Sequence, residues 1–594
     1  MDVWRLLVSF FSFLRDPPCK CLREDSLFRR GPKARLIYAT DGKVANSIIH
    51  GRLFGVIEDK RDVFRSFLVI DEIHEMNLNM EIIVAKARDY INTLIAVGQA
   101  HEFQLFIMSA TIQSNGETFK RLQAYLDAGG IDIAFRIIEN EPQKEDLIEF
   151  SDQPLTVLES GSTEALVSRI EDQVNAIKAV DKDGGILVFV SSMFIAMDLR
   201  TCMQHHADVT SVHIVFRGTS ATLRQEALNG GPGRIVICSN IAESSTLIQN
   251  IDYVIDTGTV RRSRIANEVV TLYEEKISQG EAIFRAARLR RGSPGKVYRL
   301  YTIDEFENFS VDPPSQSSRE DPRMVVAIFC TRLGLERVSC RILEGYMVSK
   351  HNRLRRATLR ELAYLGLLIV TPDVDSYEVN KPYMEIFVKQ FSNFAPSYVA
   401  MRLTISHSRF YEVYVAAQSL LGASSSLWMT FGATSLYPED DRPQTSEKNR
   451  FNDGFSEMTT VLKVYHKFIT SQNPRQFCNQ NGILIDAIYE AEKQYQSIVG
   501  KPMRHCSALE MVVQQNKLLQ HEVMSHMYVA TLNENTLKYV IVGMDYPADI
   551  RQSDAIYVDP SNISLRHKHV LCDGYFSPVD GKYFLVNTMR HPDA

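Results

Sequence analysis

Residues 67–74 of this chain read Phe-Leu-Val-Ile-Asp-Glu-Ile-His, and this stretch decides the class of fold. Its first half is continuously apolar, as a strand covered by helices on both faces should be. Two carboxylates, Asp71 and Glu72, follow the strand at once. Because open α/β sheets hold their ligands at the carboxyl ends of their strands, we predict a ligand site here. An aspartate at such a place can hold Mg²⁺ through water, and a neighbouring glutamate can orient or deprotonate an attacking water.

A second strand pattern, Gln104–Met108, ends in the small residues Ser109-Ala110-Thr111. Serine and threonine hydroxyls both donate and accept hydrogen bonds. We therefore expect this segment to bond back to the acidic residues that follow the first strand.

Short β-rich apolar runs alternate with longer helical patterns from about residue 34 to 302, which is typical of parallel α/β architecture. The expected strands are Arg35–Ala39, Phe67–Ile70, Gln104–Met108, Ile186–Val190, Val212–Phe216, Arg234–Cys238, Tyr253–Asp256 and Val297–Tyr301. A polar stretch from Asn140 to Asp152 divides them, and we place the boundary between two α/β domains there.

Beyond Ile303 the pattern changes to successive helices, interrupted by a polar loop from Tyr437 to Arg450. Strand-like segments return near the end, and their spacing predicts a small terminal β-barrel. These segments are Tyr528–Thr531, Lys538–Val542, Ala555–Val558, His569–Cys572 and Tyr583–Val586.

The composition is that of an ordinary globular protein. With 594 residues the chain should form three to five domains, and its 45% apolar content excludes a disordered or low-complexity protein. A net charge of -6 argues against a polybasic nucleic-acid coat, although not against a local basic groove. The nine cysteines do not suggest a disulfide framework, so we expect an intracellular, reducing setting. The apolar run Leu6 to Leu14 is too short to span a bilayer, and we expect no membrane partner.

The motifs occur in a recognisable order. Asp-Glu-Ile-His at 71–74 and Ser-Ala-Thr at 109–111 resemble motifs II and III of the superfamily 2 DEAH/DExH-box RNA helicases. Upstream, Thr40-Asp41-Gly42 resembles motif Ib, which touches the nucleic-acid backbone in that family. Downstream, Ile186 to Ser191 resembles motif IV, with Ser191 in the place of a backbone-contacting threonine.

Two later motifs extend the resemblance. Residues 239–245, Ser-Asn-Ile-Ala-Glu-Ser-Ser, and residues 256–258, Asp-Thr-Gly, match motif V. Residues 284–291, Phe-Arg-Ala-Ala-Arg-Leu-Arg-Arg, stand in the place of motif VI, so Arg288 and Arg291 fall on the arginine-finger positions. Guanidinium groups there would reach across a cleft and stabilise charge on a transferring phosphoryl group.

The resemblance covers nearly all of the chain and implies an α/β fold with two RecA-like parallel-sheet domains, the first incomplete, followed by three smaller domains. Residues 357–366 resemble the family's winged helix, residues 459–466 and 477–482 its helical ratchet domain, and the terminal strands its oligonucleotide-binding barrel. The implied boundaries are 1–150 and 151–305 for the RecA-like domains, 306–376 for the winged helix, 377–500 for the ratchet and 501–594 for the OB-like barrel.

The resemblance also implies roles. Catalysis would involve Asp71, Glu72, His74, Arg288 and Arg291, with Asp71 and Glu72 holding Mg²⁺ through water. Nucleotide binding or coupling would involve Ser109, Thr111, Ser245, Asp256, Gly258 and Arg285, and nucleic-acid binding Thr40, Asp41, Gly42, Ser191 and Asn240. The expected cofactors are ATP or another nucleoside triphosphate and Mg²⁺. The expected partners are RNA, single-stranded or duplex with a tail, and an activating protein.

The sequence departs from the family pattern at two places. It contains no Gly-x-x-x-x-Gly-Lys-[Ser/Thr] phosphate loop, which precedes motif Ib in the family. In motif VI, Phe284 replaces a glutamine, and Ala287 and Arg290 replace two glycines. A phenylalanine cannot make the hydrogen bonds of a glutamine.

Three explanations stay open: a truncated product of a full helicase, a reduced protein that binds RNA without hydrolysis, and a subunit completed by another polypeptide that carries the loop. We favour an incomplete or divergent ATP-dependent RNA helicase. The alternative function is that of a catalytically impaired homologue acting as an RNA-binding or scaffold protein. The compact tail resembles viral DExH nucleoside-triphosphatases such as the poxvirus enzymes, whereas the ratchet segment resembles cellular splicing and ribosome-assembly helicases.

Overall fold

A computed structural model gives the three-dimensional structure. It describes residues 20–21, 37–38, 40–42, 44–45, 66–99, 103–109, 116–131, 147–154, 163–203, 209, 211–216, 221–229, 231–240, 248–266, 269–289, 295–349, 356–373, 375–422, 451, 456–515, 519, 528–533, 538–543, 556–557, 569–572, 574–579, 582–586 and 589–590. Among these residues, no helix combines the length and the apolar character needed to cross a bilayer.

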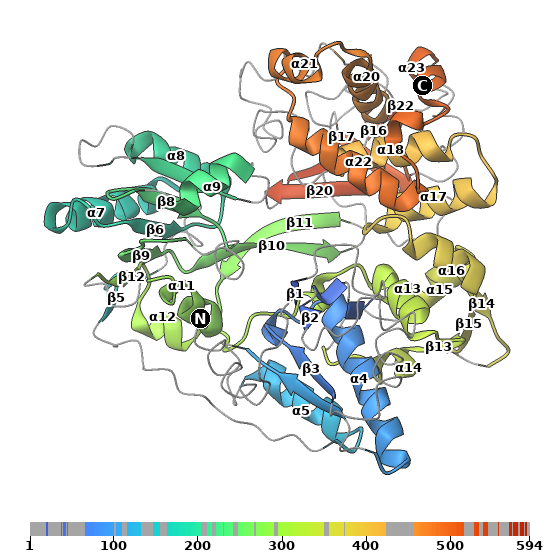
Figure 1. Cartoon of the computed structure of the whole chain (residues 1–594), viewed down its shortest axis with the longest axis horizontal. Helices are drawn as coiled ribbons and strands as arrows, with labels where there is room; N and C mark the ends of the chain where they lie inside the picture. The colour runs from blue at the N-terminus through green and yellow to red at the C-terminus, as the bar shows by residue number, and fades with distance from the viewer. Residues whose placement is uncertain are drawn as a thin grey trace.

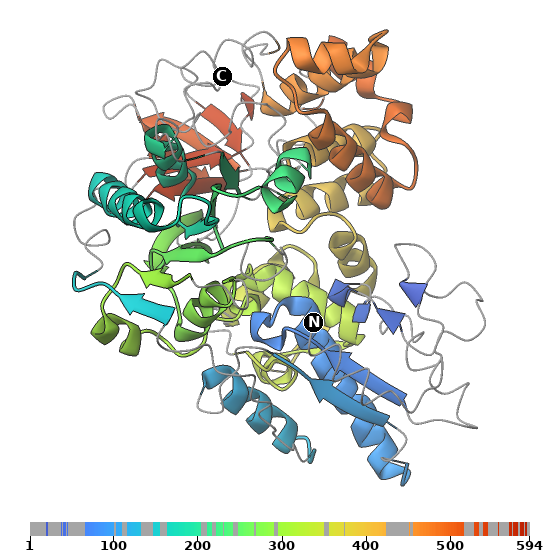
Figure 2. The ribbon, with the colours of Figure 1, turned by 60° about the vertical axis from the view of Figure 1, so that its left-hand side comes forward.

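The apolar run Phe67–Ile70 lies in the first of two parallel strands, which we call the N-terminal sheet. Strand β3 (Ser66–Ile70) pairs with β4 (Phe103–Ile107) in register from Ser66↔Phe103 to Ile70↔Ile107. Helices α4 (Leu78–Ala96) and α5 (Glu117–Asp127) pack into one apolar cluster with Leu68, Ile70 and Leu105. Figure 2 shows these strands and helices at the bottom of the molecule.

The opposite face of the N-terminal sheet corrects one expectation. The continuous apolar run predicts cover on both faces, yet Phe67, Val69 and Phe106 are 42%, 36% and 38% exposed. Their side chains alternate with those of the covered face, because successive residues of a strand point to opposite sides. Both described helices of this part lie on the other face, so only one half of the apolar surface is buried by them.

A second, larger parallel sheet, the central sheet, follows. Its strands, in spatial order, are β5 (Ile148–Phe150), β12 (Val297–Arg299), β9 (Tyr253–Asp256), β6 (Ile186–Phe189), β8 (Ile235–Cys238) and β7 (Val212–Val215). Four of the helices that accompany it are α7 (Thr163–Val180), α8 (Met193–Met203), α9 (Ala221–Asn229) and α11 (Gln279–Ala286). Strands β6, β8 and β9 are buried along their whole length, as the sequence predicts for strands covered on both faces.

Strand β5 was not expected. It lies inside the polar stretch interpreted as the boundary between two domains, yet it pairs with β12 at the edge of the central sheet. The central sheet therefore begins before the boundary placed at residues 150 and 151. The strand has only three residues, and its middle residue, Glu149, is exposed, so no apolar run marks it.

A long hairpin leaves the central sheet. Strands β10 (Thr259–Ala266) and β11 (Val269–Lys276) pair along their whole length, and β11 pairs in parallel with β20 (Gly574–Val579) near the end of the chain. Figure 1 shows β10 and β11 extending from the central sheet towards β20. The terminal strands are β16 (Tyr528–Asn533), β17 (Lys538–Gly543), β18 (Ile556–Tyr557), β19 (His569–Cys572), β20, β21 (Lys582–Val586) and β22 (Met589–Arg590).

The terminal strands are thus part of a sheet shared with the hairpin. The order is β10-β11-β20-β21-β18-β17-β16-β19-β22, and in the described part of the chain this order is open at both ends. A separate closed barrel was expected from the sequence. All five expected terminal strands are present, while β20 and β22 were not expected.

Helices dominate between the central sheet and the terminal strands. They are α12 (Ile303–Glu307), α13 (Pro322–Leu333), α14 (Cys340–Glu344), α15 (Arg356–Tyr364), α16 (Lys381–Val388), α17 (Phe394–Ile405), α18 (Tyr411–Leu421), α20 (Glu457–Thr470), α21 (Pro474–Gln480), α22 (Ile485–Val499) and α23 (Leu509–Gln514), with short 3-10 turns η4 (Ser317–Arg319) and η6 (Met503–His505). A small antiparallel sheet has the order β13 (Arg337–Val338), β15 (Tyr377–Val379), β14 (Leu368–Val370).

Two apolar cores occupy this helical region. One cluster holds α13 to α17 together with the small sheet, whose strand β15 lies beyond residue 376. The other holds α18, α20, α22 and α23 and continues to Leu519, beyond residue 500. The domain boundaries at residues 376 and 500 stay predictions.

Helix α4 fastens the N-terminal sheet to the helical region. Its fully buried Glu81 accepts hydrogen bonds from Ser317 Oγ at 2.9 Å, Val348 N at 2.7 Å and Ser349 N at 3.0 Å. Burial raises the pKa of this carboxyl, and the hydrogen bonds offset part of that rise. The backbone oxygen of Glu75 also accepts from Gln316 N at 3.0 Å. The loop after β3 is therefore held in place from outside its own sheet.

Candidate active site

The loop after β3 has an unusual backbone. Glu72 (φ 54°, ψ 36°) and Met76 (φ 35°) are both in the left-handed region, on either side of the 3-10 turn η1 (Ile73–Glu75). Residues other than glycine rarely adopt this conformation, and such strain is concentrated at functional sites. The Glu72 N–H donates to Asp71 Oδ1 at 2.9 Å. The loop thus places two carboxylates at the end of the strand, Asp71 exposed and Glu72 half-buried.

The loops after β3 and β4 are bonded to each other, but the partners are backbone groups and His74, not the acidic side chains that the sequence predicts. Met108 N donates to the Ile70 oxygen at 2.8 Å, and Ile73 N donates to the Met108 oxygen at 3.2 Å. His74 Nδ1 lies 3.1 Å from Ser109 Oγ in a hydrogen bond between side chains. A change at either loop is therefore transmitted to the other through both backbone and side chains.

Burial makes this cluster poorly solvated. It raises the pKa of Glu72 from 4.5 to about 7, with smaller contributions from the neighbouring carboxylates of Asp71 and Glu75, while Arg288 acts in the opposite sense. Burial likewise lowers the pKa of His74 from 6.5 to about 4, so its imidazole is neutral at pH 7. The shifted pKa values of Glu72 and His74 both favour the uncharged form of the side chain. Such shifts are concentrated at catalytic sites.

The second wall of the site comes from the central sheet. Helix α11 starts with a capping box in which Ser278 and Glu281 bond each other's backbone. Phe284 on this helix is buried against His74, with ring centroids 4.8 Å apart. Arg288 follows just after the helix, and its charge acts on Glu72. One apolar and one cationic side chain from α11 and the residues after it therefore meet the acidic loop.

Removing the Phe284 ring should hydrate His74. We expect Phe284→Ala to raise the pKa of His74 from about 4 towards 6.5, because burial is the main cause of the low value. A histidine whose pKa is depressed on folding gives full stability above about pH 6.5 and loses it as the pH falls towards 4. The variant should therefore be less stable at pH 7 but should lose less stability on acidification. NMR titration of the imidazole measures the pKa directly.

Ile283→Ala is the matched control for this experiment. Ile283 neighbours Phe284 on the same helix but is 39% exposed, and the pKa of His74 should not change in that variant. An unchanged pKa of His74 in Phe284→Ala would contradict the role given to the ring.

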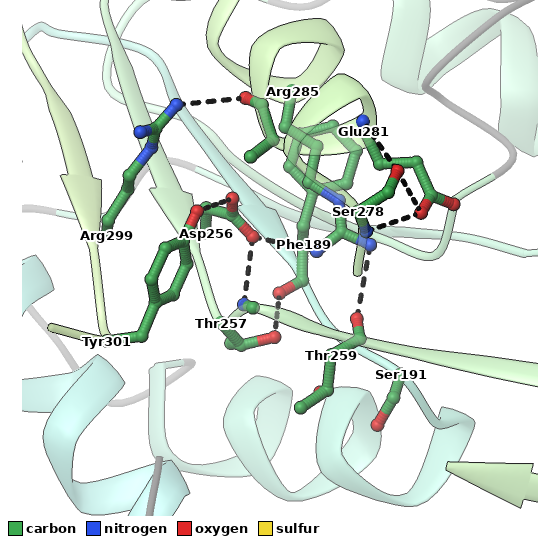
Figure 3. Close-up of polar contacts among 12 residues, drawn as sticks. Phe189, Ser191, Asp256, Thr257, Thr259, Ser278, Glu281, Arg285, Arg299 and Tyr301 are labelled. Atoms are coloured by element: carbon green, nitrogen blue, oxygen red, sulfur yellow. Dashed lines mark hydrogen bonds and ion pairs between the residues drawn. The ribbon is translucent and has the colours of Figure 1, made fainter. Parts of the chain in front are cut away.

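Behind this contact lies a buried ionic core, drawn in Figure 3. Arg285 Nη1 donates to Asp256 Oδ1 at 2.7 Å, and its Nη2 donates to the Thr259 oxygen at 3.1 Å. Asp256 also accepts from Gly258 N and from the Tyr301 hydroxyl, both at 2.9 Å. Both charged side chains are fully buried. In this arrangement they hold α11 against β9, so they could couple the site to the sheet but do not reach solvent.

A second ionic cluster supports the start of the same helix. Arg262 on β10 donates to both carboxylate oxygens of Glu281 at 2.7 Å and also pairs with Glu275. Although burial opposes it, this pairing lowers the pKa of Glu281. Sequence reasoning did not assign Glu281 or Arg262 to the site. The Ser-x-x-Glu pattern at 278–281 is the signal that could have pointed to the helix start.

The residues expected to touch nucleic acid are spread over two places. Near α4, Thr40 is exposed, and Asp41 accepts from Asn79 Nδ2 at 3.1 Å. At the central sheet, Ser191 and Asn240 follow the neighbouring strands β6 and β8. Asn240 is exposed, whereas Ser191 is buried and donates to Glu274 Oε1 at 2.6 Å. Gly42, expected beside Asp41, lies near Asn79.

Three expected site residues, Thr111, Ser245 and Arg291, lie outside the described residues. Of the remaining set, Asp71, Glu72, His74, Ser109 and Arg288 gather at one place, between the two sheets.

The acidic loop has the chemistry of a site for a hard cation. Glu72 Oε2 is buried without a hydrogen-bond partner, although His74 Nδ1 lies 3.3 Å away. Carboxylate oxygens are the ligands that Mg²⁺ prefers, and Mg²⁺ usually keeps several waters and needs only one or two carboxylates. No cluster of three or more acidic, histidine or cysteine ligands occurs among the described residues. The loop therefore fits Mg²⁺ held through water and phosphate, and does not fit a dedicated protein cage.

Comparison with known proteins places this geometry in context. No protein-family model matches the chain. It is 24% identical over 484 residues to L540 of Acanthamoeba polyphaga mimivirus, a protein whose name assigns it to the ATP-dependent RNA helicases; the match covers 77% of this chain and 64% of L540. It is 26% identical over 294 residues to the ATP-dependent RNA helicase DEAH12 of Arabidopsis thaliana, covering 48% of this chain and 15% of that protein.

A bacterial relative matches over a similar span. The ATP-dependent RNA helicase HrpA of Escherichia coli is 26% identical over 276 residues, which cover 45% of this chain and 20% of HrpA. The chain thus spans less than two thirds of each of these three relatives. Its homologues are DEAH-box ATP-dependent RNA helicases, which confirms the relationship to superfamily 2 that the motifs indicate.

Proposed function

We propose that this relative of the DEAH-box helicases is an RNA-stimulated nucleoside triphosphatase that translocates on RNA and unwinds or remodels it. The observation that carries the proposal is that acidic and cationic side chains lie close together between the two sheets. Carboxylates after β3 face the cationic Arg288 that follows α11. Phosphoryl transfer needs both: a cation-holding, water-activating group on one side and a guanidinium on the other.

The acidic loop would hold and use the metal nucleotide. Asp71 is exposed and would hold Mg²⁺ through water. Bound Mg²⁺ and ATP would supply the phosphoanhydride and neutralise its charge. Glu72, half-buried and with a raised pKa, would orient the attacking water and take its proton. Arg288, with Arg291, would stabilise the charge that develops on the transferring phosphoryl group.

The same contacts would couple hydrolysis to movement. His74 touches Ser109 on one side and Phe284 on the other, so it bridges the loop after β4 and helix α11. Separation of the two sheets would break the His74–Phe284 contact and remove Arg288 from Glu72 together. Hydrolysis would then occur only when the sheets are closed on each other.

The remaining parts would serve as the accessory modules of an RNA motor. The small sheet with α13 and α15 would be the winged helix, the core of α18, α20 and α22 the ratchet, and the terminal strands the OB-like module. Thr40, Asp41, Gly42, Ser191 and Asn240 would contact the RNA backbone. Backbone contacts position a strand but carry no sequence code, so little base specificity is expected.

The proposal is tested by measuring phosphate release from ATP with and without single-stranded RNA, together with RNA binding at about 50 and 200 mM salt. We expect RNA to stimulate hydrolysis, and binding to weaken steeply between the two salt concentrations, because neutralised phosphates release counterions. RNA binding without hydrolysis would support the alternative of a catalytically impaired RNA-binding homologue. Absence of both would refute the proposal.

A further inference from the structure

Ser191 lies where contact with nucleic acid is expected, yet its hydroxyl already donates a hydrogen bond within the chain. Its Oγ donates to Glu274 Oε1 at 2.6 Å, and the side chain is buried. A hydrogen bond to a carboxylate of this length is charge-assisted and about twice as strong as one between neutral groups. A hydroxyl has one proton, so Ser191 cannot donate to a phosphate while it donates to Glu274.

The partner carboxylate comes from the hairpin. Glu274 lies on β11, and in the β10–β11 register it is paired with Arg261. Directly paired residues of antiparallel strands share a face of the sheet, so Arg261 and Glu274 are neighbours on one face. A serine hydroxyl and an arginine are two of the donor types that bind nucleic-acid phosphates. The Glu274 carboxylate thus occupies a place built for an anion.

The order of the strands also supports an anion site at this place. Ser191 follows β6 and Asn240 follows β8, and these strands are neighbours that end at one edge of the central sheet. Figure 3 shows Ser191 at this edge, beyond Phe189 at the end of β6. Exposed Asn240 would remain available to a backbone phosphate or sugar at that edge, while the neighbouring donor is covered by a carboxylate of the chain itself.

We propose that Glu274 stands in for a backbone phosphate in the RNA-free chain and competes with RNA for the hydroxyl of Ser191. The inference rests on the proposed function and adds a determinant of RNA affinity to it. RNA must displace the carboxylate and take its donor, and the charge of Glu274 repels the incoming phosphate. Glu274 therefore lowers the affinity for RNA, and its removal should raise it.

The test measures fluorescence anisotropy of a fluorescein-labelled oligouridylate with the full chain. We expect Glu274→Gln to bind about tenfold more tightly, since hydrogen bonds to charged groups are among the stronger ones. Ser191→Ala should bind more weakly than the unaltered chain. In the Ser191→Ala background, Glu274→Gln should recover only a small part of the tenfold gain, because the donor that both anions share is gone.

Glu164→Gln is the matched control. Glu164 is exposed in the first turn of α7, so this variant makes the same change in net charge at another place on the chain and should bind RNA as the unaltered chain does. Thermal unfolding of each variant shows whether the hairpin remains folded.

Each other outcome has a definite meaning. Unchanged or weaker binding by Glu274→Gln would overturn the inference. The role of Glu274 would then be to hold the hairpin against the central sheet. An equal gain in both backgrounds would also overturn it, since charge alone would then explain the effect. An unaltered chain that binds RNA, with no gain in the variant, sinks only this inference. A chain and variants that bind no RNA at about 50 mM salt sink the proposed function and this inference together.

Discussion

Replacement of Glu72 by glutamine is expected to lower RNA-stimulated ATP hydrolysis by about 10²–10⁴-fold and to leave RNA binding unchanged. Glutamine keeps the size of the side chain but cannot accept a proton from water. The side chain is half-buried, and its Oε2 has no hydrogen-bond partner, so no hydrogen bond is lost at that oxygen when the carboxylate becomes an amide. The measurement is the rate of phosphate release at saturating RNA. A rate within about twofold of the unaltered chain would exclude Glu72 as the base.

The pH dependence of hydrolysis is a second, independent test of Glu72 as the base. A base acts in its ionised form, and burial with Asp71 and Glu75 nearby raises the pKa of Glu72 to about 7. Hydrolysis should therefore rise with pH through about 7. Glu75→Gln is the matched control: it removes one neighbouring charge that raises the pKa, so it should keep hydrolysis and shift the half-maximal rate to lower pH. A profile that is flat between pH 6 and 8, a range of about one unit on each side of that value, would contradict the assignment.

The sequence predicted the two parallel sheets because their strands depend on short-range patterns. Buried parallel strands read as continuous apolar runs, and β9 begins and ends where the sequence placed it. The polar residues directly after β3 and β4 gather at one edge by geometry alone. The sequence therefore placed Ser109 beside the acidic loop, although the partner of its hydroxyl is His74 and not a carboxylate.

The parts that were missed depend on partners far away in the chain. Strands β10 and β11 are absent from the expected strands: β10 carries three arginines, and the outer edge of β11 is covered by β20 from near the end of the chain. Glu81 reads as one more helical glutamate, because its backbone donors lie 267 and 268 residues away. The motif pattern identified Ser191, but its partner Glu274 is 83 residues away, so the pattern could not show that its hydroxyl is occupied.

Arg285→Met should weaken the packing of α11 on the central sheet by about 3–5 kcal/mol, the usual cost of leaving one partner of a buried ion pair alone. Asp256 would keep its bonds from Gly258 N and the Tyr301 hydroxyl, but it would have lost its closest countercharge in a fully buried place. A chain with several cores does not unfold in one step, so a global free energy of unfolding is a poor measure here. Hydrogen exchange of peptides from α11 and β9 reports the local opening instead.

The expected result is that exchange in these two elements becomes more than a hundredfold faster, since each 1.4 kcal/mol is about a factor of ten. Ile283→Ala, on the same helix but 39% exposed and outside the ion pair, should leave exchange nearly unchanged and controls for a side-chain truncation elsewhere on α11. Arg285→Lys should fall between the two, because an ammonium keeps the charge but cannot bridge Asp256 and the Thr259 oxygen with a rigid fork. Faster exchange confined to α11, with β9 protected as before, would mean that the ion pair does not join the helix to the sheet. The coupling of Phe284 and Arg288 to the central sheet would then have to run through the Glu281–Arg262 cluster instead.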